Sequence, residues 1–430
     1  MLKRKQTRWY PLDNAAKIYP PTASADRAHV FAFSALLTEQ VNSFLLQQAV
    51  TKALEQFPTF KTKLMKGNFW YYLEENKLPV KVFKEDAYYL KPIDYKLNNG
   101  YLFEVLYIRN KITIKFFHAL TDGTGGLEFF KTVLVEYFSF LGEKADSEGV
   151  VKPIDAPANA LNEEDSFLKY QNSSKEKKKT IPKPYHIEGT PFDYDGCGMI
   201  TLKTDVSKIK EVAKHFGVTV TAYLAGLYSY AIYKAYLNKR PVKNKKVTVL
   251  IPCNLRKKYG GETMRNFTMF ARFIYDFSNS EPITLQNLCT LCAEQMNEDL
   301  RIDNLDKMID DNVKSEKNFL VKITPLSVKN LLLRAIYSKV GEVLQTVNLS
   351  NLGVIKLPNG VSKMVKDITF AITPTFSCNH QTGVISFNDK LYLTFSRGFV
   401  ETEVEKQFIE VLTESGVSVT VSSNYWESKI

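Results

Sequence analysis

The feature that most constrains the fold is an alternating strand that ends in a histidine and leads through a glycine-rich turn into a helix. Ile112, Ile114, Phe116 and His118 share one face of this strand. Apolar residues then recur at helical spacing, at Leu127, Phe130, Leu134, Tyr137 and Phe138. The sequence therefore predicts a strand, a turn and a helix, with the histidine on the apolar side of the strand end.

The segment His118-Ala119-Leu120-Thr121-Asp122-Gly123 is the candidate reactive segment. An imidazole fixed between apolar walls is partly desolvated, so its pKa stays near or below neutrality, as a general base requires. Three other interpretations compete. His118 could be a core residue bonded to a backbone carbonyl, a metal ligand beside Asp122, or a neighbour of backbone N–H groups that cradle a phosphate. No further cluster of ligand residues stands nearby, and the glycine spacing is not that of a nucleotide P-loop.

The whole pattern H-x-x-x-D-G resembles the signature of the superfamily that contains chloramphenicol acetyltransferase, alcohol acyltransferases and the condensation domains of nonribosomal peptide synthetases. Many members carry two adjacent histidines, of which the second is catalytic. Here Phe117 takes the first position and His118 the second. This departure favours the acyltransferases over true condensation domains.

Three other segments extend the resemblance over nearly the whole chain. Residues 249–256 (VLIPCNLR), with Met264-Arg265-Asn266-Phe267, resemble the Asn-Leu-Arg turn and Arg-Asn-Phe segment of the family. Residues 348–353 (NLSNLG) resemble its Ser-Asn-Leu-Gly strand, and residues 8–12 (RWYPL) fit the start of the bacterial alcohol acetyltransferase-like branch. Their order along the chain supports the resemblance more than any one of them does.

The resemblance implies an α+β fold of two related mixed-sheet domains covered by helices, with an active-site channel at the domain interface. A chain of 430 residues can bury two cores of ordinary size. We predict an N-terminal domain over residues 1–165, a linker over 166–185 and a C-terminal domain over 186–430. The linker lies in a stretch rich in Lys, Glu, Asp, Ser, Asn and Pro.

The resemblance also implies roles for individual residues. His118 would be the catalytic base, and Asp122 would pair with an arginine, for which Arg256 is the candidate, to fix the loop. Gly123 would allow a close backbone approach or an unusual φ. Asn351 and Ser350 are candidate donors to the oxyanion. Arg256 could equally be an ordinary surface arginine, and Asn351 and Ser350 could simply end a strand.

The function implied is transfer of an acyl group, in the first place acetyl, from acyl-CoA to an alcohol by direct general-base transfer. Acyl-CoA would be a cosubstrate, and we expect no metal and no tightly bound cofactor. The acceptor would be a small-molecule alcohol or amine. Two alternatives stay open: a condensation-type catalyst that takes its acyl group from an acyl carrier protein, and a non-catalytic, degenerate binding member of the family.

Composition limits the other classes of function. The net charge of +11 suggests an anionic partner, but the lysines are scattered without a recognition helix, so we expect no nucleic acid. The phosphates of coenzyme A are a suitable anion. The five cysteines are an odd, scattered set, which indicates a reduced, cytoplasmic protein. Cys289 and Cys292 fall on the buried stripe of a predicted helix, and no apolar run is long enough to span a membrane.

Overall fold

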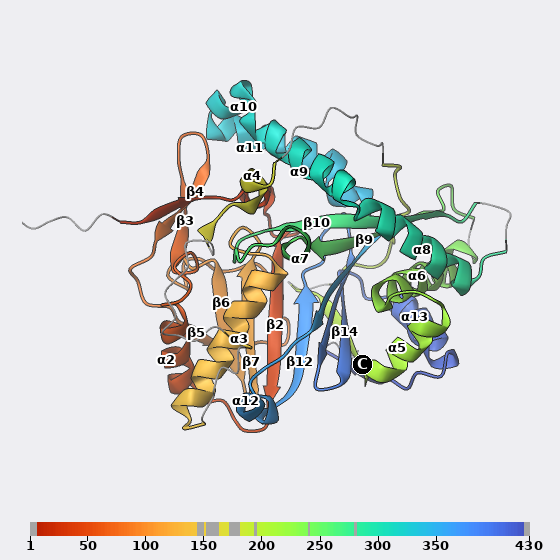
Figure 1. Ribbon diagram of the computed structural model, residues 1–430, viewed down its shortest axis with the longest axis horizontal. Helices are drawn as coiled ribbons and strands as arrows, with labels where there is room; N and C mark the ends of the chain where they lie inside the picture. Colours follow the sequence, from red (N-terminus) through yellow and green to blue (C-terminus); the bar gives the residue numbers. More distant parts are fainter. Residues whose placement is uncertain are drawn as a thin grey trace, which may run out of the picture.

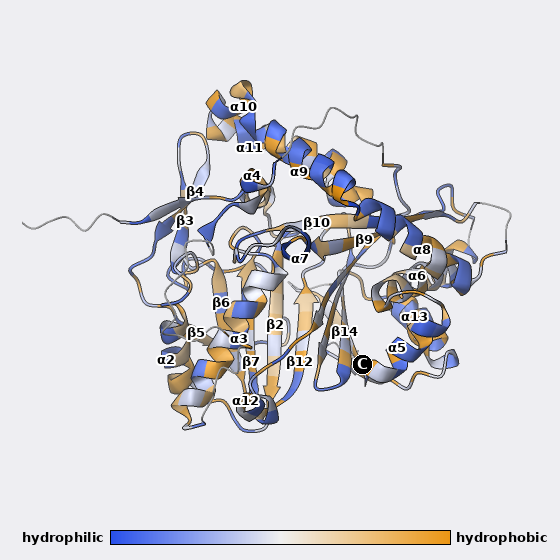
Figure 2. Ribbon diagram, viewed as in Figure 1, coloured by the Kyte–Doolittle hydropathy of each residue, from blue (hydrophilic) through white to orange (hydrophobic). Residues whose placement is uncertain are grey.

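The computed structural model describes residues 7–143, 150–151, 163–171, 181–192, 196–239, 241–278 and 282–424. Two large β-sheets lie side by side in it, and helices cover them (Figure 1). Each sheet has its own hydrophobic core of buried side chains. The apolar strands of these sheets are visible as orange and white ribbons in Figure 2.

The five-stranded sheet is built mainly from the first half of the chain. Its strands are β2 (Val30–Leu37), β5 (Val82–Lys84), β6 (Phe103–Ile108), β7 (Lys111–Phe117) and β12 (Val365–Ile372). They follow the order β12-β2-β7-β6-β5, in which β5 and β6 are parallel and the other neighbours antiparallel. Helices α2 (Ser43–Ala53) and α3 (Gly123–Phe140) pack against each other over this sheet (Figure 1). A small separate sheet joins β1 (Trp9–Pro11), β4 (Tyr71–Glu75) and β3 (Thr62–Lys66).

The seven-stranded sheet comes from the second half of the chain. Its strands are β8 (Gly198–Asp205), β9 (Lys246–Asn254), β10 (Thr268–Asp276), β11 (Val347–Val354), β13 (His380–Phe387), β14 (Lys390–Arg397) and β15 (Thr420–Ser423). Their order is β10-β9-β11-β13-β14-β8-β15, and β11 runs parallel to both of its neighbours. The covering helices are α5 (Val206–His215), α6 (Val220–Ile232), α8 (Leu285–Asp299) and α13 (Glu403–Glu414). The prediction of an α+β fold with two mixed sheets covered by helices is therefore confirmed.

The division of the chain into residues 1–165, 166–185 and 186–430 stays a prediction. Two observations show how closely the halves are joined. Strand β12 belongs to the second half but forms the edge of the five-stranded sheet, paired with β2. Helix α4 (Ser166–Lys169) lies at the start of the predicted linker, and its Phe167 is fully buried with Leu255 and Phe267. Residues 172–180 of that linker lie outside the described part of the chain.

The structure also shows the buried side of α8 and the residues that cap two of the helices. Helix α8 carries Cys289 and Cys292 on its buried side, as predicted, and Thr219 caps α6 through a bond from the Ala222 amide. Helix α2 begins at Ser43 and is capped by Asn42, whose side chain accepts from the backbone N–H groups of Phe44 and Leu45. Within the described ranges, no helix combines the length and the apolar character needed to cross a membrane.

Candidate active site

His118 lies just beyond the end of β7, where both halves of the chain meet. Its backbone N–H donates to the carbonyl of His29 at 2.9 Å. The ring is held between aromatic neighbours, with Tyr19 stacked on it at 4.5 Å between centroids and Phe31 edge-on at 5.3 Å. The residue nevertheless keeps some solvent exposure. The aromatic neighbours thus fix the orientation of the ring.

The Nδ1 atom of His118 is 3.0 Å from Oδ1 of Asn266. The amide nitrogen of Asn266 donates to Oδ2 of Asp13 at 3.1 Å and to the carbonyl of His118 at 3.2 Å. Both of these partners only accept hydrogen bonds, so the amide oxygen must face the imidazole. His118 therefore carries its proton on Nδ1, which leaves Nε2 as the basic nitrogen.

Burial lowers the pKa of His118 below its ordinary value, and it outweighs the nearby charge of Asp122 and the bond to Asn266, which both raise it. The ring is accordingly neutral at pH 7. A neutral imidazole with a fixed tautomer and one free nitrogen can accept a proton from a bound hydroxyl or amine.

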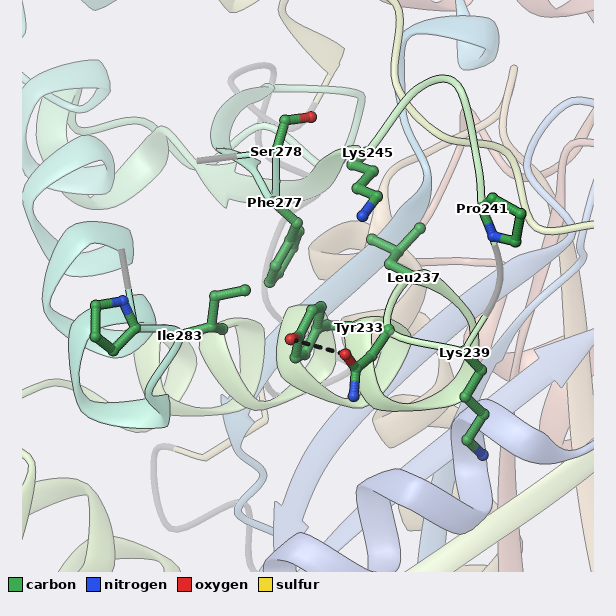
Figure 3. Close-up of a pocket in the computed structure, with 10 residues that line it drawn as sticks. Tyr233, Leu237, Lys239, Pro241, Lys245, Phe277, Ser278 and Ile283 are labelled. Atoms are coloured by element: carbon green, nitrogen blue, oxygen red, sulfur yellow. Dashed lines mark hydrogen bonds between the residues drawn. The ribbon is translucent and has the colours of Figure 1, made fainter. Parts of the chain in front are cut away.

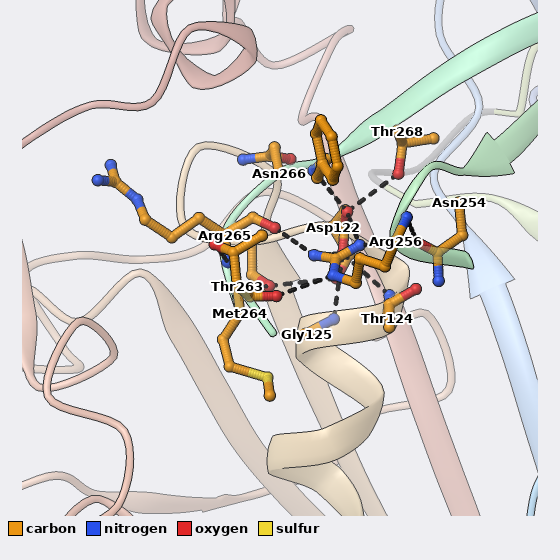
Figure 4. A network of polar contacts seen from close by, with 12 residues as sticks. Asp122, Thr124, Gly125, Asn254, Arg256, Thr263, Met264, Arg265, Asn266 and Thr268 are labelled. Carbon is orange, nitrogen blue, oxygen red and sulfur yellow. Dashed lines mark hydrogen bonds and ion pairs between the residues drawn. The ribbon is translucent and has the colours of Figure 1, made fainter. Parts of the chain in front are cut away.

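Asp122 is the centre of a polar network that holds the loop after His118 (Figure 4). Its carboxylate caps α3 by accepting from the backbone N–H groups of Thr124 and Gly125, both at 3.1 Å. It also accepts from the backbone N–H of Phe267 at 2.9 Å and from the hydroxyl of Thr268 at 3.0 Å. Both oxygens are thereby occupied away from the imidazole.

Arg256, at the start of α7 (Arg256–Tyr259), completes this network. Its two Nη atoms donate to the two oxygens of Asp122 at 2.9 and 3.1 Å, in a bidentate pair. Its other donors reach the carbonyls of Thr263 and Arg265 and the side chain of Asn254. Burial alone would raise the pKa of Asp122, but Arg256 and the backbone donors hold it below its ordinary value. The structure thus brings the two residues together, and Arg256 is not an ordinary surface arginine.

The glycines of the loop have unequal roles. A Cβ on Gly123 would meet only the side chain of Leu352, at 3.0 Å. A Cβ on Gly125 would lie 2.1 Å from the carbonyl oxygen of Met264 and 2.2 Å from Oγ1 of Thr121. The close backbone approach that the sequence suggested for Gly123 is therefore required at Gly125, where the two halves of the chain touch.

The candidate oxyanion donors lie on β11, whose end reaches the same loop through Leu352. Ser350 is buried within the strand. The Asn351 amide donates to the hydroxyl of Thr221 at 3.0 Å, and its oxygen accepts from the backbone N–H of Gly353 at 2.9 Å. These contacts are with α6 and the strand end, and none is with His118. Their role at an oxyanion stays a prediction.

Sequence reasoning missed Asp13, Tyr19 and the individual role of Asn266. The motif Arg265-Asn266-Phe267 did contain a signal, because each member contributes one contact. Arg265 faces Asp13 at 3.5 Å, Asn266 orients His118, and the Phe267 amide binds Asp122. Nothing in the local sequence connects Asp13 or Tyr19 with a histidine about a hundred residues away.

A hollow of about 690 Å³ opens elsewhere, at the far end of β9 and β10 (Figure 3). Tyr233, Leu237, Lys245 and Phe277 are among the residues that line it. The nine-residue strand β9 separates this end from Asn254 beside Arg256, and it spans about 26 Å from its first to its last residue at 3.3 Å per residue. The hollow is therefore no part of the His118 site.

Comparison with known protein structures identifies the fold. Neither models of protein families nor curated protein sequences match this chain. Among solved structures, TRI101 of F. sporotrichioides, in complex with coenzyme A and T-2, matches with a TM-score of 0.62 and 9% identity over 97% of this chain and 100% of that one. Polyketide synthase associated protein 5 of Mycobacterium tuberculosis matches with a TM-score of 0.57 and 12% identity over 94% and 97%. The epimerization domain of tyrocidine synthetase B matches with a TM-score of 0.55 and 11% identity over 95% and 97%.

The chain has the chloramphenicol acetyltransferase-like fold. These matches extend over almost the full length of both partners, so the likeness concerns the fold of the whole chain. The neighbours of this fold include acetyltransferases and synthetase domains, so the fold itself leaves the reaction to be argued from His118 and its surroundings.

Proposed function

We propose that this protein is an acyltransferase that moves an acyl group, in the first place acetyl, from a coenzyme A thioester to an alcohol. The observation that supports this most is the state of His118. Its Nδ1 is bonded to Asn266 Oδ1 at 3.0 Å, its pKa is lowered by burial, and Nε2 remains as the basic atom. A general base for the attack of a hydroxyl on a thioester needs these properties.

In the proposed reaction, Nε2 of His118 takes the proton of the acceptor hydroxyl as its oxygen attacks the thioester carbonyl. The C–O bond forms, and the carbonyl becomes a tetrahedral oxyanion, for which Asn351 and Ser350 are the proposed donors. Collapse of this intermediate breaks the C–S bond, and the imidazolium returns the proton to the departing thiolate. Asn266 and Asp13 keep the tautomer during both transfers, while Asp122 and Arg256 hold the loop and do not exchange protons.

The test is turnover with acetyl-CoA and a panel of alcohols and amines, followed by release of free thiol and by mass spectrometry of the products. We expect His118→Ala to lower turnover by about 10²–10⁴-fold, the usual contribution of a general base. His215→Ala is the matched control, because His215 is exposed on α5 and should leave turnover unchanged. Equal turnover in both variants would contradict the proposal.

The donor is tested separately. If acyl-CoA yields no product but an acylated carrier protein does, the condensation-type alternative is correct. If neither donor yields product, the protein binds without turnover. The proposed location is the cytoplasm, which is in keeping with five cysteines that all lie in the described residues as free thiols.

A further inference from the structure

Helices α10 (Phe319–Ile323) and α11 (Leu326–Val340) expose an apolar face at the upper edge of the molecule in Figure 1. The side chains on this face share an exposure of about half or more: Phe319 70%, Leu320 69%, Ile323 49%, Val328 47%, Leu331 66%, Leu332 53%, Ile336 54% and Val340 59%. Their spacing in α11 follows one side of a helix. Large apolar side chains exposed together along one side of a helix indicate a contact surface.

This face, which we call the α10–α11 face, belongs to a segment whose charged residues are all cations. Every charged residue from Lys317 to Val340 is a cation: Lys317, Lys322, Lys329, Arg334 and Lys339. Of these only Lys329 is buried, with its Nζ placed 3.6 Å from the centroid of the Trp70 ring. Arg334 lies on the side of α11 turned toward α1, so Lys317, Lys322 and Lys339 are the exposed cations that accompany the apolar side chains.

Additional exposed aromatic side chains lie beside both ends of α11. The backbone N–H of Leu326 donates to the backbone carbonyl of Asn68 at 2.9 Å. This bond brings Phe69, which is 47% exposed, next to the start of the helix. Glu342 follows the helix and interacts with Thr375, next to which Phe376 is 79% exposed. Aromatic side chains of this kind are enriched where a protein meets the headgroup region of a bilayer.

The opposite side of α11 faces the candidate active site. Arg334 Nε donates to the carbonyl of Pro21 in α1 (Tyr19–Thr22) at 2.5 Å, and the Tyr337 ring packs on His29 at 5.8 Å. Tyr19, at the start of α1, stacks on His118. One layer, α1, thus separates α11 from the imidazole.

We propose that the α10–α11 face docks on an anionic lipid surface. Large exposed apolar side chains accompanied by exposed lysines, on a helix too short to span a membrane, are the features of a segment that lies in the membrane interface. Anionic headgroups complement its cations, and the cytoplasmic leaflet carries such lipids. A second copy of the chain would instead place the same cations against one another. Docking would hold α1, which packs on His118, close to the bilayer, a consequence that rests on the proposed function.

Co-sedimentation with vesicles tests this surface in the full chain. We expect binding to vesicles of phosphatidylcholine with 30% phosphatidylglycerol, weaker binding to phosphatidylcholine alone, and a decrease with added salt. Leu331→Glu and Ile336→Glu should each weaken binding by about tenfold or more, because they place a charge in the apolar face. Phe44→Glu is the matched control, since Phe44 is 68% exposed on α2, away from this face.

A second pair separates specific docking from attraction by net charge. Lys322→Gln with Lys339→Gln should weaken binding, whereas Lys210→Gln with Lys214→Gln, on the exposed side of α5, should not. No binding by the wild type, or equal binding by all variants, would overturn the proposal. A dimer in sedimentation velocity that Leu331→Glu dissociates, without vesicle binding, would overturn it in favour of self-association. Turnover with a short water-soluble alcohol should be unaffected by Leu331→Glu, which distinguishes loss of docking from loss of catalysis.

Discussion

Asn266 Oδ1 lies 3.0 Å from Nδ1 of His118, although 148 residues separate the two in the sequence. The Asn266 amide is oriented by Asp13, so the carboxylate determines which nitrogen of the imidazole is basic. Asp13, Asn266 and His118 therefore form one chain of hydrogen bonds that links the N-terminus, the C-terminal half and the candidate base.

Asn266→Ala should lower kcat with acetyl-CoA and an alcohol by about 10- to 100-fold, because part of the imidazole would adopt the wrong tautomer. The effect should be smaller than that of His118→Ala. Asp13→Asn should act in the same direction, since an amide in place of the carboxylate no longer fixes the orientation of Asn266. If Asn266→Ala changes KM alone, the orienting role is wrong.

The pH dependence of kcat/KM should report His118. Because burial lowers its pKa below 6.5, the imidazole is in its basic form throughout neutral pH. Activity should therefore fall only when the pH drops below about 6.5, the ordinary value for histidine, and it should not fall through this group as the pH rises. A midpoint above pH 7 in the acid limb would contradict the assignment.

Asp122→Ala should lower the free energy of unfolding by about 3–5 kcal/mol, because it leaves the guanidinium of Arg256 without its carboxylate and α3 without its cap. Arg256→Lys should cost less, about 1–3 kcal/mol, since the charge remains but the bidentate pair is lost. Urea unfolding measures both changes. Turnover should fall along with stability in Asp122→Ala, whereas His118→Ala should unfold near the wild-type concentration of urea.

Gly125→Ala should destabilise the protein far more than Gly123→Ala. The added methyl group at position 125 would lie 2.1 Å from a backbone oxygen, so the contact between the halves would have to open, at a cost of about 3 kcal/mol. At position 123 only the flexible side chain of Leu352 has to move. A thermal unfolding series of both variants checks this order, and equal midpoints would show that the contact at Met264 is not tight.

Acid stability should depend on His29, whose pKa is lowered to about 3, mainly by burial and in smaller part by His118 and Arg27. Between pH 6.5 and 3 the unfolded chain binds a proton that the folded chain does not, so the free energy of unfolding falls as the pH falls. The backbone φ at position 29 is +50°, a value that asparagine adopts readily, so His29→Asn should not strain the backbone. Between pH 7 and pH 5, the free energy of unfolding of this variant should fall by about 2 kcal/mol less than that of the wild type. His215→Asn, at an exposed position, is the control, and its free energy of unfolding should fall over this pH range by as much as that of the wild type.

Much of the local structure followed from sequence because it depends on neighbours in the chain. Strand β7, helix α3 behind it and the buried cysteines of α8 all come from the periodicity of adjacent residues. Strand β7 also shows the limit of such reasoning. Lys115 lies on its second face but is buried there, paired with Glu104 at 2.7 Å.

What the sequence determined by itself was the segment that carries His118, its place at a strand end, and the candidate partner Arg256, because a strand, a turn and a short motif are encoded by adjacent residues. Only the tertiary structure decided which nitrogen of His118 is basic, which glycine is indispensable and which helix face is left uncovered. Asp13, Asn266, Met264 and α11 come from distant parts of the chain. Hydrogen-bond direction, steric contact and exposure arise only when folding brings such parts together.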